Sequence, residues 1–536
     1  MSSIRPPSLG PIVGHTTPSS CRLWIRAGDP SDARSSLSED RRTLGVITVL
    51  EKGKPVPSSS TRTAYFRLHR EYDRTGTFNL GVDEGIRPAG KPLALEPDTE
   101  YRVRLGTLAL DDAYQNDVIV SDEELAKRLP PANVWAGELF GLPAEDSEAV
   151  FRTYKKKADA VSFLIGSCHY PGLFWKKKHS DRIFLPMIKE VEKDRSAGNP
   201  QFVMMVGDQI YADMFNRLIP IGLADTYEEY QERYHDAFGS TNIRRLLRSV
   251  PQYMILDDHE IEDNWSQDRI AEDRNKRVLF NLAIGAYMSY QWSHGPRNPE
   301  YDGRLYYKFD CNGFPFFVLD ERTQRFKDDE PGLDDNHLLG RPSMYPKKEP
   351  TQLDHLCEWL TAHKKDPRPK FIVSPTVFVP NPVLTTKSDR HKDKSDAWPA
   401  FPATRRRLLS HIVNNQIQNV VFLSGDIHCS NVGEIYFSGN KSVEKLKAFS
   451  VTSSAFYWPF WFADGEPSNY VHNSRRQKDT FMVDEAANIK MDYRAYNFTQ
   501  KDNFCRVDVD WANRKMQVRA IDRKGNRIEQ ATLKLA

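Results

Sequence analysis

The first 110 residues alternate between apolar and polar positions in short stretches. Stretches such as CRLWIRA (21–27), LGVITVL (44–50), TAYFRLH (63–69) and YRVRLGTL (101–108) are separated by clusters of Pro, Gly, Ser and Asp. Side chains of a strand point alternately to its two faces, so this pattern predicts half-buried antiparallel strands joined by turns. The sequence therefore predicts a small β-sandwich over residues 1–110.

One segment of this region resembles a known module. LEPDTEYRVRLG, residues 95–106, is similar to the closing strand region of fibronectin type III and related immunoglobulin-like domains. The resemblance implies an N-terminal fibronectin III-like domain, which alone suggests packing or binding and no chemistry. Residues 111–155 are polar and predict helical or irregular structure, so we expect them to form a connector.

The pattern changes after residue 155, where apolar strand-like segments alternate with amphipathic ones. Apolar residues recur at helical spacing in three segments that precede or separate predicted strands: 181–194, 351–365 and 404–416. This alternation is typical of an α/β domain. The tail, 503–535, alternates like hairpin strands around RKGN and is expected to complete a second sheet. We expect one α/β (α+β) domain over residues 156–536.

Composition narrows the classes of function. Lys plus Arg (75) nearly balances Asp plus Glu (73), which leaves a formal charge of +2. This balance indicates no specific nucleic-acid or membrane partner. The 6 cysteines are spread without any C-x-x-C pair, so neither a disulfide framework nor a zinc ribbon is predicted. We expect a monomer.

The N-terminal segment also bears on location. Residues 1–24 carry prolines and polar residues where a secretory signal needs an uninterrupted apolar run. No stretch approaches the ~18 consecutive apolar residues that a transmembrane helix needs. The sequence as written predicts a cytoplasmic protein, although a signal removed from a precursor would leave no trace.

Polar groups able to bind a metal or an anion follow the ends of five predicted strands. They are Cys168 and His169, Asp208 and Tyr211, Asp258 with His259 and Asn264, Arg322 and Arg325, and Asp426 and His428. In an extended segment, Asp426 and His428 would point to the same side. Ligands of open α/β sheets bind beyond the carboxyl ends of the strands, so we expect these loops to share one site.

The types of residue indicate the chemistry of that site. Thiolate, phenolate, carboxylate and imidazole form a mixed ligand set, which suits a transition metal beside a harder divalent ion. Two metals about 3.5–4 Å apart would orient a hydroxide and clamp a phosphoryl oxygen. Arg322 would then neutralise the remaining phosphate oxygens. The implied reaction is hydrolysis of a phosphate ester.

Six motifs, in order, carry a resemblance to a known family. GSCHYPG, GDQIYAD, LDDHEIEDNW, LDERTQR, SDAWPAFPATRRRLL and SGDIHCS resemble motifs of the PhoD-like alkaline phosphatases, a branch of the metallophosphoesterases. Motif support covers residues 160–435. The resemblance implies a metallophosphoesterase-type β-sandwich flanked by helices. It also implies a centre of Fe(3+) with one or two Ca(2+) ions, a hydroxide nucleophile on the metal, and activity on small or polymeric phosphomonoesters and phosphodiesters.

The resemblance also implies roles for single residues. Ligands around iron would be Cys168, Asp208, Tyr211, Asp426 and His428, with Asp208 as the bridge, while Asn264 and Asp258 would serve the second metal. His259 and Arg322 would face the phosphate. His259 would either protonate the leaving oxygen or orient a carboxylate.

Two residues are expected beside the substrate on weaker grounds. His169 stands where the family more often has glutamine, so contacts with substrate near the iron would differ. Arg325 would either grip phosphate together with Arg322 or form an ion pair with a nearby carboxylate. We assign His169, Arg322 and Arg325 to substrate binding.

Two other classes of function stay open. The aromatic stretch SSAFYWPFWFADGE, residues 453–466, would be either a lip that accepts an apolar leaving group or a buried cover for a sheet edge. A lip would favour a phospholipase-like esterase that acts on lipid headgroups with the same metals. Alternatively, the protein is a binding protein in which the sandwich module does the work and the metal site is structural.

Overall fold

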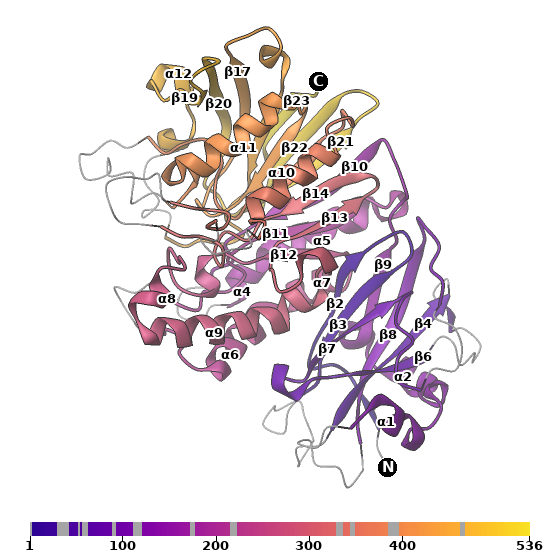
Figure 1. Ribbon diagram of the computed structural model, residues 1–536. Helices are drawn as coiled ribbons and strands as arrows, with labels where there is room; N and C mark the ends of the chain where they lie inside the picture. The colour runs from indigo at the N-terminus through magenta and orange to yellow at the C-terminus, as the bar shows by residue number, and fades with distance from the viewer. Residues whose placement is uncertain are drawn as a thin grey trace.

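The computed structural model describes most of the chain. The described residues are 3–28, 42–51, 54–55, 63–87, 93–110, 120–171, 177–214, 222–327, 336–342, 349–383, 396–460 and 467–536. They form an N-terminal β-sandwich that packs against a larger α/β body (Figure 1). Within these ranges, no helix combines the length and the apolar character needed to cross a membrane.

Two antiparallel sheets form the N-terminal sandwich. One contains β2 (Leu9–Thr16), β3 (Cys21–Arg26) and β7 (Thr75–Leu80). The other contains β1 (Ile4–Arg5), β8 (Glu100–Ala109), β4 (Thr43–Glu51), β5 (Lys54–Pro55), β6 (Thr63–Arg67) and β9 (Glu148–Arg152). Apolar side chains from both sheets, including Leu23, Ile47 and Val103, meet in one buried core. The alternating pattern therefore arises because one face of each strand is buried.

The predicted connector contains regular structure. It holds α1 (Asp122–Arg128), α2 (Ala136–Gly141), α3 (Ala144–Ser147) and β9. Strand β9 pairs with β8, so residues 148–152 extend the N-terminal sheet. The domain limits at residues 110 and 155 stay predictions.

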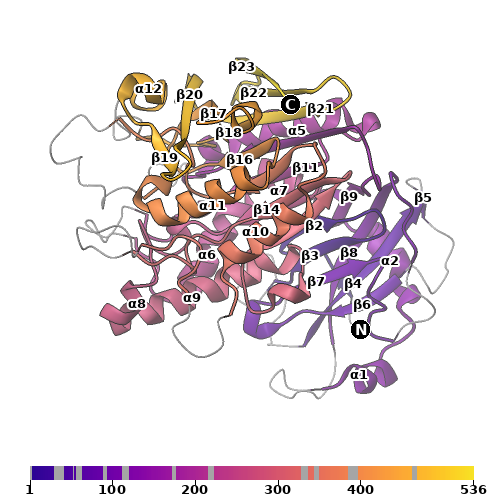
Figure 2. The ribbon, with the colours of Figure 1, turned by 45° about the horizontal axis from the view of Figure 1, so that its top comes forward.

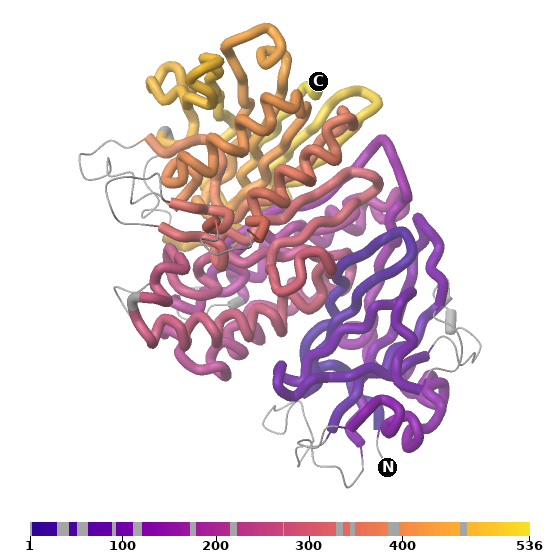
Figure 3. The backbone as a smooth tube through the Cα atoms, viewed as in Figure 1, coloured from indigo at the N-terminus to yellow at the C-terminus, as the bar shows by residue number. Residues whose placement is uncertain are grey.

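Two larger sheets form the α/β body. The first has the order β12-β11-β10-β21-β22-β23, with bounds Gln252–Ile255, Phe202–Val206, Ala160–Gly166, Asn503–Asp510, Lys515–Asp522 and Arg527–Lys534. Strands β10, β11 and β12 are parallel, and the C-terminal strands continue from β10 in antiparallel pairing. Figure 3 shows this return of the yellow C-terminal segment to the magenta strand β10.

The second large sheet has eight strands. Its order is β13-β14-β15-β16-β18-β17-β20-β19, with bounds Tyr307–Cys311, Phe314–Val318, Lys370–Val373, Val420–Ser424, Ala448–Thr452, Ser430–Ser438, Ile489–Thr499 and Phe481–Asp484. Strands β14, β15, β16 and β18 run parallel. The carboxyl ends of these strands carry part of the site described below.

A core rich in aromatic rings joins the two large sheets. Phe163 of the first sheet lies edge-on to Phe316 and Phe371 of the second, with ring centroids 5.6 and 5.4 Å apart. Such rings bury large apolar areas, so they account for much of the attraction between the sheets. The facing sheets place the ends of their parallel strands at one edge of the sandwich.

Helices cover both outer faces of this double sheet. One face is packed against α5 (Phe184–Lys193), α6 (Tyr227–Gly239), α7 (Thr241–Leu247) and α9 (Arg274–Tyr290). The other is covered by α10 (Gln352–Ala362) and α11 (Pro402–Asn414), which lie in front of the sheet in Figures 1 and 2. Short helices α4 (Lys177–Ser180), α8 (Arg269–Glu272) and α12 (Ser474–Gln477) complete the body. The predicted β-sandwich flanked by helices is confirmed, including all three helices predicted from spacing.

Polar contacts join the N-terminal sandwich to the helices of the body. The indole Nε1 of Trp24 donates a hydrogen bond to Ser289 O at 2.8 Å. The carboxylate of Asp73 accepts from Arg26 Nε at 2.6 Å and contacts His235 Nε2 of α6 at 2.9 Å. The Tyr290 hydroxyl of α9 also donates to Asp73. A buried charge at this joint is therefore bonded from both sides.

Candidate active site and metal centre

The candidate site lies where parallel strands of both large sheets end. Cys168 follows β10, Asp208 follows β11, and Asp426 follows β16. The sequence Asp257, Asp258, His259 follows β12, and Arg322 follows β14. Contacts between these residues bring the five loops together, as the sequence predicts.

The backbone at this site has an unusual conformation. Five residues predicted as metal ligands have positive φ angles: Cys168 (57°), Asp208 (56°), Asn264 (56°), Asp426 (70°) and His428 (50°). For residues other than glycine, this left-handed region is strained, and such residues cluster where function requires it. The expectation that Asp426 and His428 lie in an extended strand is wrong. Strand β16 ends at Ser424, and His428 N donates to Asp426 O at 3.0 Å in a tight turn.

Two glycines allow the loops to approach closely. A Cβ at Gly207, whose φ is 86°, would collide with the side chain of Asp257. A Cβ at Gly425 would collide with Ser167 Oγ and lie 2.7 Å from Val206 O. The glycines before Asp208 and Asp426 therefore let the ends of four strands, β10, β11, β12 and β16, come together.

Two overlapping groups of side chains could each hold a metal ion. One consists of Asp208, Asp258 and His259, and the other of Asp257, Asp258 and Asp426. Within each group the potential ligand atoms all lie within 4.8 Å of one another. Asp208 Oδ1 and Asp257 Oδ2 are buried without a hydrogen-bond partner among the described residues. Buried carboxylate oxygens without donors fit a bound cation, so the residues present suit a metal centre.

The pKa values of the carboxyl groups in this cluster also favour a bound cation. Burial, followed by the charges of Asp258 and Glu260, raises the pKa of Asp208 well above its usual range, although His259 opposes this. Burial, followed by the charges of Asp396 and Asp258, raises the pKa of Asp426 to about 8. Like charges that are crowded away from water disfavour ionisation. A cation would stabilise the ionised carboxylates.

Cys168 and Tyr211 lie beside the first group. Cys168 Sγ is 3.2 Å from Asp208 Oδ2, and the Tyr211 hydroxyl is 3.4 Å from the same oxygen. Burial raises the pKa of both groups well above the ordinary values, so each keeps its proton unless a cation is bound. Their position is compatible with sharing one ion with Asp208.

The other two predicted ligands have different surroundings. The His428 ring stacks on Trp458, with centroids 3.7 Å apart and planes at 18°. The Asn264 side chain donates to Asp263 Oδ1 at 3.1 Å, and its backbone N donates to Asp258 Oδ2 at 2.6 Å. Neither residue belongs to the two groups above, so their roles as ligands stay predictions.

A buried glutamate that sequence reasoning missed ties two of the loops together. Glu260 accepts hydrogen bonds from the backbone N–H groups of Asp208 (3.1 Å), Gln209 (2.7 Å) and Asp257 (2.9 Å). Gln291 Nε2 of the loop after α9 donates to it at 3.2 Å. One side chain therefore sets the spacing between the loop after β11 and the loop after β12.

His259 is held by a second carboxylate that sequence reasoning missed. Its Nδ1 lies 2.8 Å from Asp213 Oδ1, and Asp213 Oδ2 accepts from Asp263 N at 2.7 Å. Burial disfavours the charged imidazole, but the charges of Asp213, Asp258 and Asp208 hold the pKa of His259 well above its usual value. These carboxylates favour the protonated imidazole.

Arg322 lies within the acidic cluster. Its side chain has 0% exposure, and Nε donates to Asp257 Oδ1 at 2.6 Å. Its other nitrogens donate to Asp396 at 3.1 and 2.7 Å, and Nη2 lies 3.5 Å from Asp258 Oδ1. All three nitrogens therefore contact carboxylates, and the predicted contact with phosphate stays a prediction.

The remaining two residues assigned to substrate binding are also buried. Arg325 forms an ion pair with Asp396, and its guanidinium lies over the Phe401 ring, 4.9 Å from the centroid. The His169 ring lies edge-on to Phe184 at 4.8 Å, and burial lowers the pKa of His169 to about 4. Their contact with substrate stays a prediction. Asp396, which joins both arginines, was overlooked although it lies within the motif SDAWPAF.

An aromatic wall borders the cluster. Tyr170, Tyr211 and Tyr457 are buried together, with Trp458 and Phe460 packed against them. Trp458 and Phe460 are half-buried. The aromatic stretch, predicted to be either a lip or a buried cover, therefore begins beside the site, while residues 461–466 lie outside the described residues.

Two facing sheets with helices on both sides, and carboxylates gathered at the ends of their parallel strands, define a metallophosphoesterase-type fold. A family model described as "PhoD-like phosphatase" matches residues 181–520. The chain belongs to this family. This confirms the family predicted from the six ordered motifs.

Individual relatives agree with this assignment. The curated protein "Alkaline phosphatase D" of Bacillus subtilis (strain 168) is 25% identical over 236 residues, which are 41% of this chain and 38% of that protein. The chain therefore aligns with little more than a third of that relative's length. A solved structure entitled "Structure of PhoD" covers 99% of this chain and 89% of its own, with a TM-score of 0.63 and 17% identity. That likeness shows the fold.

Proposed function

We propose that this protein hydrolyses phosphate esters, both monoesters and diesters, with metal ions held by the acidic cluster. One observation carries the proposal. Asp208, Asp257, Asp258 and Asp426 are gathered in two groups that share Asp258, and two of their buried oxygens lack donors among the described residues. In a member of the PhoD-like phosphatase family, such a cluster suits binding of a phosphate group next to cations.

The donor set suggests which ions would bind. Cys168 and Tyr211 would add soft and phenolic ligands to Asp208, which suits ferric iron, whereas the carboxylates around Asp257 and Asp426 suit calcium. When bound, these ions would supply Lewis-acid polarisation of a phosphoryl oxygen and charge neutralisation. The identity of the ions is part of the proposal.

His259 would act as the proton donor. Asp213 contacts Nδ1, so Nε2 would be the nitrogen that donates to the leaving oxygen of an ester. The charge of Asp213, which is not among the proposed metal ligands, raises the pKa of His259 and so favours a ring that can donate a proton. Asp213 also fixes the orientation of the ring, because it is itself held by the backbone of Asp263.

Arg322 would support the cluster from within. Its guanidinium bonds to Asp257 and Asp396 and lies near Asp258, so it compensates part of their charge and restricts their orientation. A direct grip on phosphate would require one of these contacts to break.

A comparison of leaving groups tests the assignment of His259. In His259→Gln, hydrolysis of alkyl phosphate esters should fall by roughly 10²–10⁴, because an alkoxide needs a proton to leave. Hydrolysis of p-nitrophenyl esters should fall much less, because that leaving group needs no proton. Equal losses for both ester classes would contradict a role as proton donor.

Metal analysis and a substrate panel test the proposal as a whole. The purified protein should contain metal in stoichiometric amounts and hydrolyse mono- and diesters. A metal-loaded protein that hydrolyses no ester in the panel would favour the alternative of a binding protein with a structural metal site.

A phospholipase-like activity on lipid headgroups is the second candidate. The half-buried side chains of Trp458 and Phe460 give the site an apolar border, which favours it. Trp458→Ala should then reduce kcat/KM for a phosphodiester with an acyl chain more than for the same headgroup without one. An equal effect on both substrates would oppose this candidate.

A further inference from the structure

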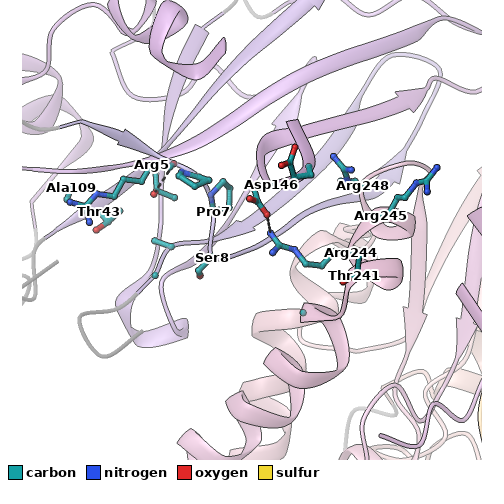
Figure 4. Close-up of a pocket in the computed structure, with 16 residues that line it drawn as sticks. Arg5, Pro7, Ser8, Thr43, Ala109, Asp146, Thr241, Arg244, Arg245 and Arg248 are labelled. Atoms are coloured by element: carbon teal, nitrogen blue, oxygen red, sulfur yellow. Dashed lines mark hydrogen bonds and ion pairs between the residues drawn. The ribbon is translucent and has the colours of Figure 1, made fainter. Parts of the chain in front are cut away.

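A cavity lies away from the acidic cluster, where the N-terminal sandwich meets helix α7. Its volume is about 700 Å³, within the range of ligand pockets, and it shares no lining residue with the acidic cluster. Figure 4 shows Arg5 on one side of Pro7 and Ser8, with Arg244, Arg245 and Arg248 on the other. The cavity is therefore basic at both ends.

The charges of two of these arginines are already compensated. Arg244 Nη2 lies 3.2 Å from Asp146 Oδ1 and donates to Gly10 O at 3.2 Å, which ties α7 to the sandwich. Arg245 pairs with Glu192. The buried Arg244 side chain is therefore a fixed part of the wall, whereas the ion pair of Arg245 is exposed.

The other two arginines have no ion pair with any carboxylate in the described ranges. Arg248 Nη1 donates only to backbone carbonyls, at 2.5 Å from Ala144 O and 3.5 Å from Glu148 O. Arg5 Nη1 and Arg248 Nε are both buried without a hydrogen-bond partner among the described residues. Glu145 and Asp146 also line the cavity, and their charges together with that of Glu148 act on Arg248. Four arginines still outnumber the two carboxylates of the lining, and guanidinium N–H groups without acceptors are unfavourable, so an anion in the cavity would be stabilised by Arg5 and Arg248.

The chemistry of the lining suggests the kind of anion. Guanidinium groups match phosphate oxygens with paired N–H donors, and the hydroxyl of Thr241 adds a further donor. Because Arg5 and Arg248 lie on opposite sides of Pro7 and Ser8, a ligand with two separated phosphate groups would satisfy both (Figure 4).

We propose that this cavity is a second ligand site, which binds an anion carrying two or more phosphate groups and of nucleotide size or smaller. The ligand would contact β1 of the sandwich through Arg5 and the end of α7 through Arg248. Binding should therefore stabilise the joint between the two parts of the protein.

Calorimetric titration with 1,4-butanediphosphonate, whose two phosphonate groups are separated by four methylene groups and are not hydrolysed, tests the proposal. The full-length, metal-loaded protein is titrated in excess calcium, so that chelation affects every variant equally. The variant Arg5→Gln/Arg248→Gln should bind the probe at least roughly tenfold more weakly than the wild type at one site. Its kcat/KM for phosphate esters should be unchanged.

Arg182→Gln is the matched control, because Arg182 is an exposed arginine outside the cavity. It should bind the probe like the wild type. The probe should also raise the Tm of the wild type and the control more than that of the double variant.

Three results would overturn the proposal. They are equal binding by the double variant and the wild type, an equal loss in Arg182→Gln, and binding of the dicarboxylate succinate as tightly as the diphosphonate. Circular dichroism checks folding. If the double variant does not fold, Arg5→Gln alone is titrated, and unchanged binding in that variant overturns the proposal equally.

Discussion

Replacing Glu260 by glutamine should lower both the free energy of unfolding and the affinity for metal ions. Glu260 Oε2 accepts from the N–H groups of Asp208 and Asp257, and Oε1 accepts from that of Gln209. A glutamine can keep its oxygen at only one of these positions. In the best arrangement it preserves two of the three backbone bonds. Its NH₂ group then faces the N–H of Gln209 and Nε2 of Gln291, whose amide can turn its oxygen towards it.

The number of backbone N–H groups left without an acceptor sets the expected loss of stability. One buried N–H without an acceptor costs about 1–3 kcal/mol, so Glu260→Gln should lower the free energy of unfolding by that amount. Glu260→Ala leaves all three donors unsatisfied and should cost at least about 3 kcal/mol. The loops that carry Asp208 and Asp257 would also lose their common anchor. In both Glu260 variants, metal affinity should fall roughly 10–100-fold, as is typical when a group that orients metal ligands is removed.

Glu262→Gln provides the control on the same loop. Glu262 is also buried, but its carboxylate pairs with Arg269 and Lys276 and contacts no backbone N–H of the site loops. Urea melts, metal content and kcat/KM are measured for both variants. Glu262→Gln should lose stability and retain metal, while Glu260→Gln should lose both. If Glu260→Gln keeps its metal and its rate, the positioning role assigned to Glu260 is wrong.

Three further predictions concern the metal ions and the contact between the N-terminal sandwich and the α/β body. Exhaustive chelation should abolish ester hydrolysis, and added calcium should restore it; full activity in protein shown to be metal-free would contradict the proposed centre. Cys168→Ala should lose iron and the visible charge-transfer band, whereas Cys311→Ala, in the core between the sheets, should keep both. Loss of the band in both variants would point to general instability. The third prediction concerns the pKa of Asp73. Burial raises this pKa, but His235 and Arg26 outweigh burial and hold it at about 2, below its ordinary 3.8. This stabilisation is present above pH 4 and is lost as the pH falls towards 2. The difference in unfolding free energy between wild type and Asp73→Asn should therefore shrink by about 2 kcal/mol across that window. A difference that does not change with pH would contradict this reasoning.

The sequence by itself determined the elements and the chemistry at their ends. Strand β11 and the first four residues of β16 are continuous apolar runs, and β10 is interrupted only by Ser162; burial on both faces leaves such runs few alternatives. Helix α10 begins after Thr351, whose side chain accepts from Asp354 N, a local signal that the sequence displays. Polar residues directly after these strands were therefore predictable as neighbours, because parallel strands end at a common edge.

Only the tertiary structure decided which side chains contact one another. Arg322 binds Asp396, which lies 74 residues away, and Glu260 bonds to backbone N–H groups of Asp208 and Gln209 from a different strand end. The left-handed conformations of Asp208 and Asp426 depend on loops that hold them in place, and no local pattern encodes them. The pairing of β9 with β8 and the cavity between Arg5 and Arg248 likewise join distant segments. The physical reason is that local sequence sets backbone preferences and burial patterns, whereas partners of buried charges are selected by the packing of the whole chain.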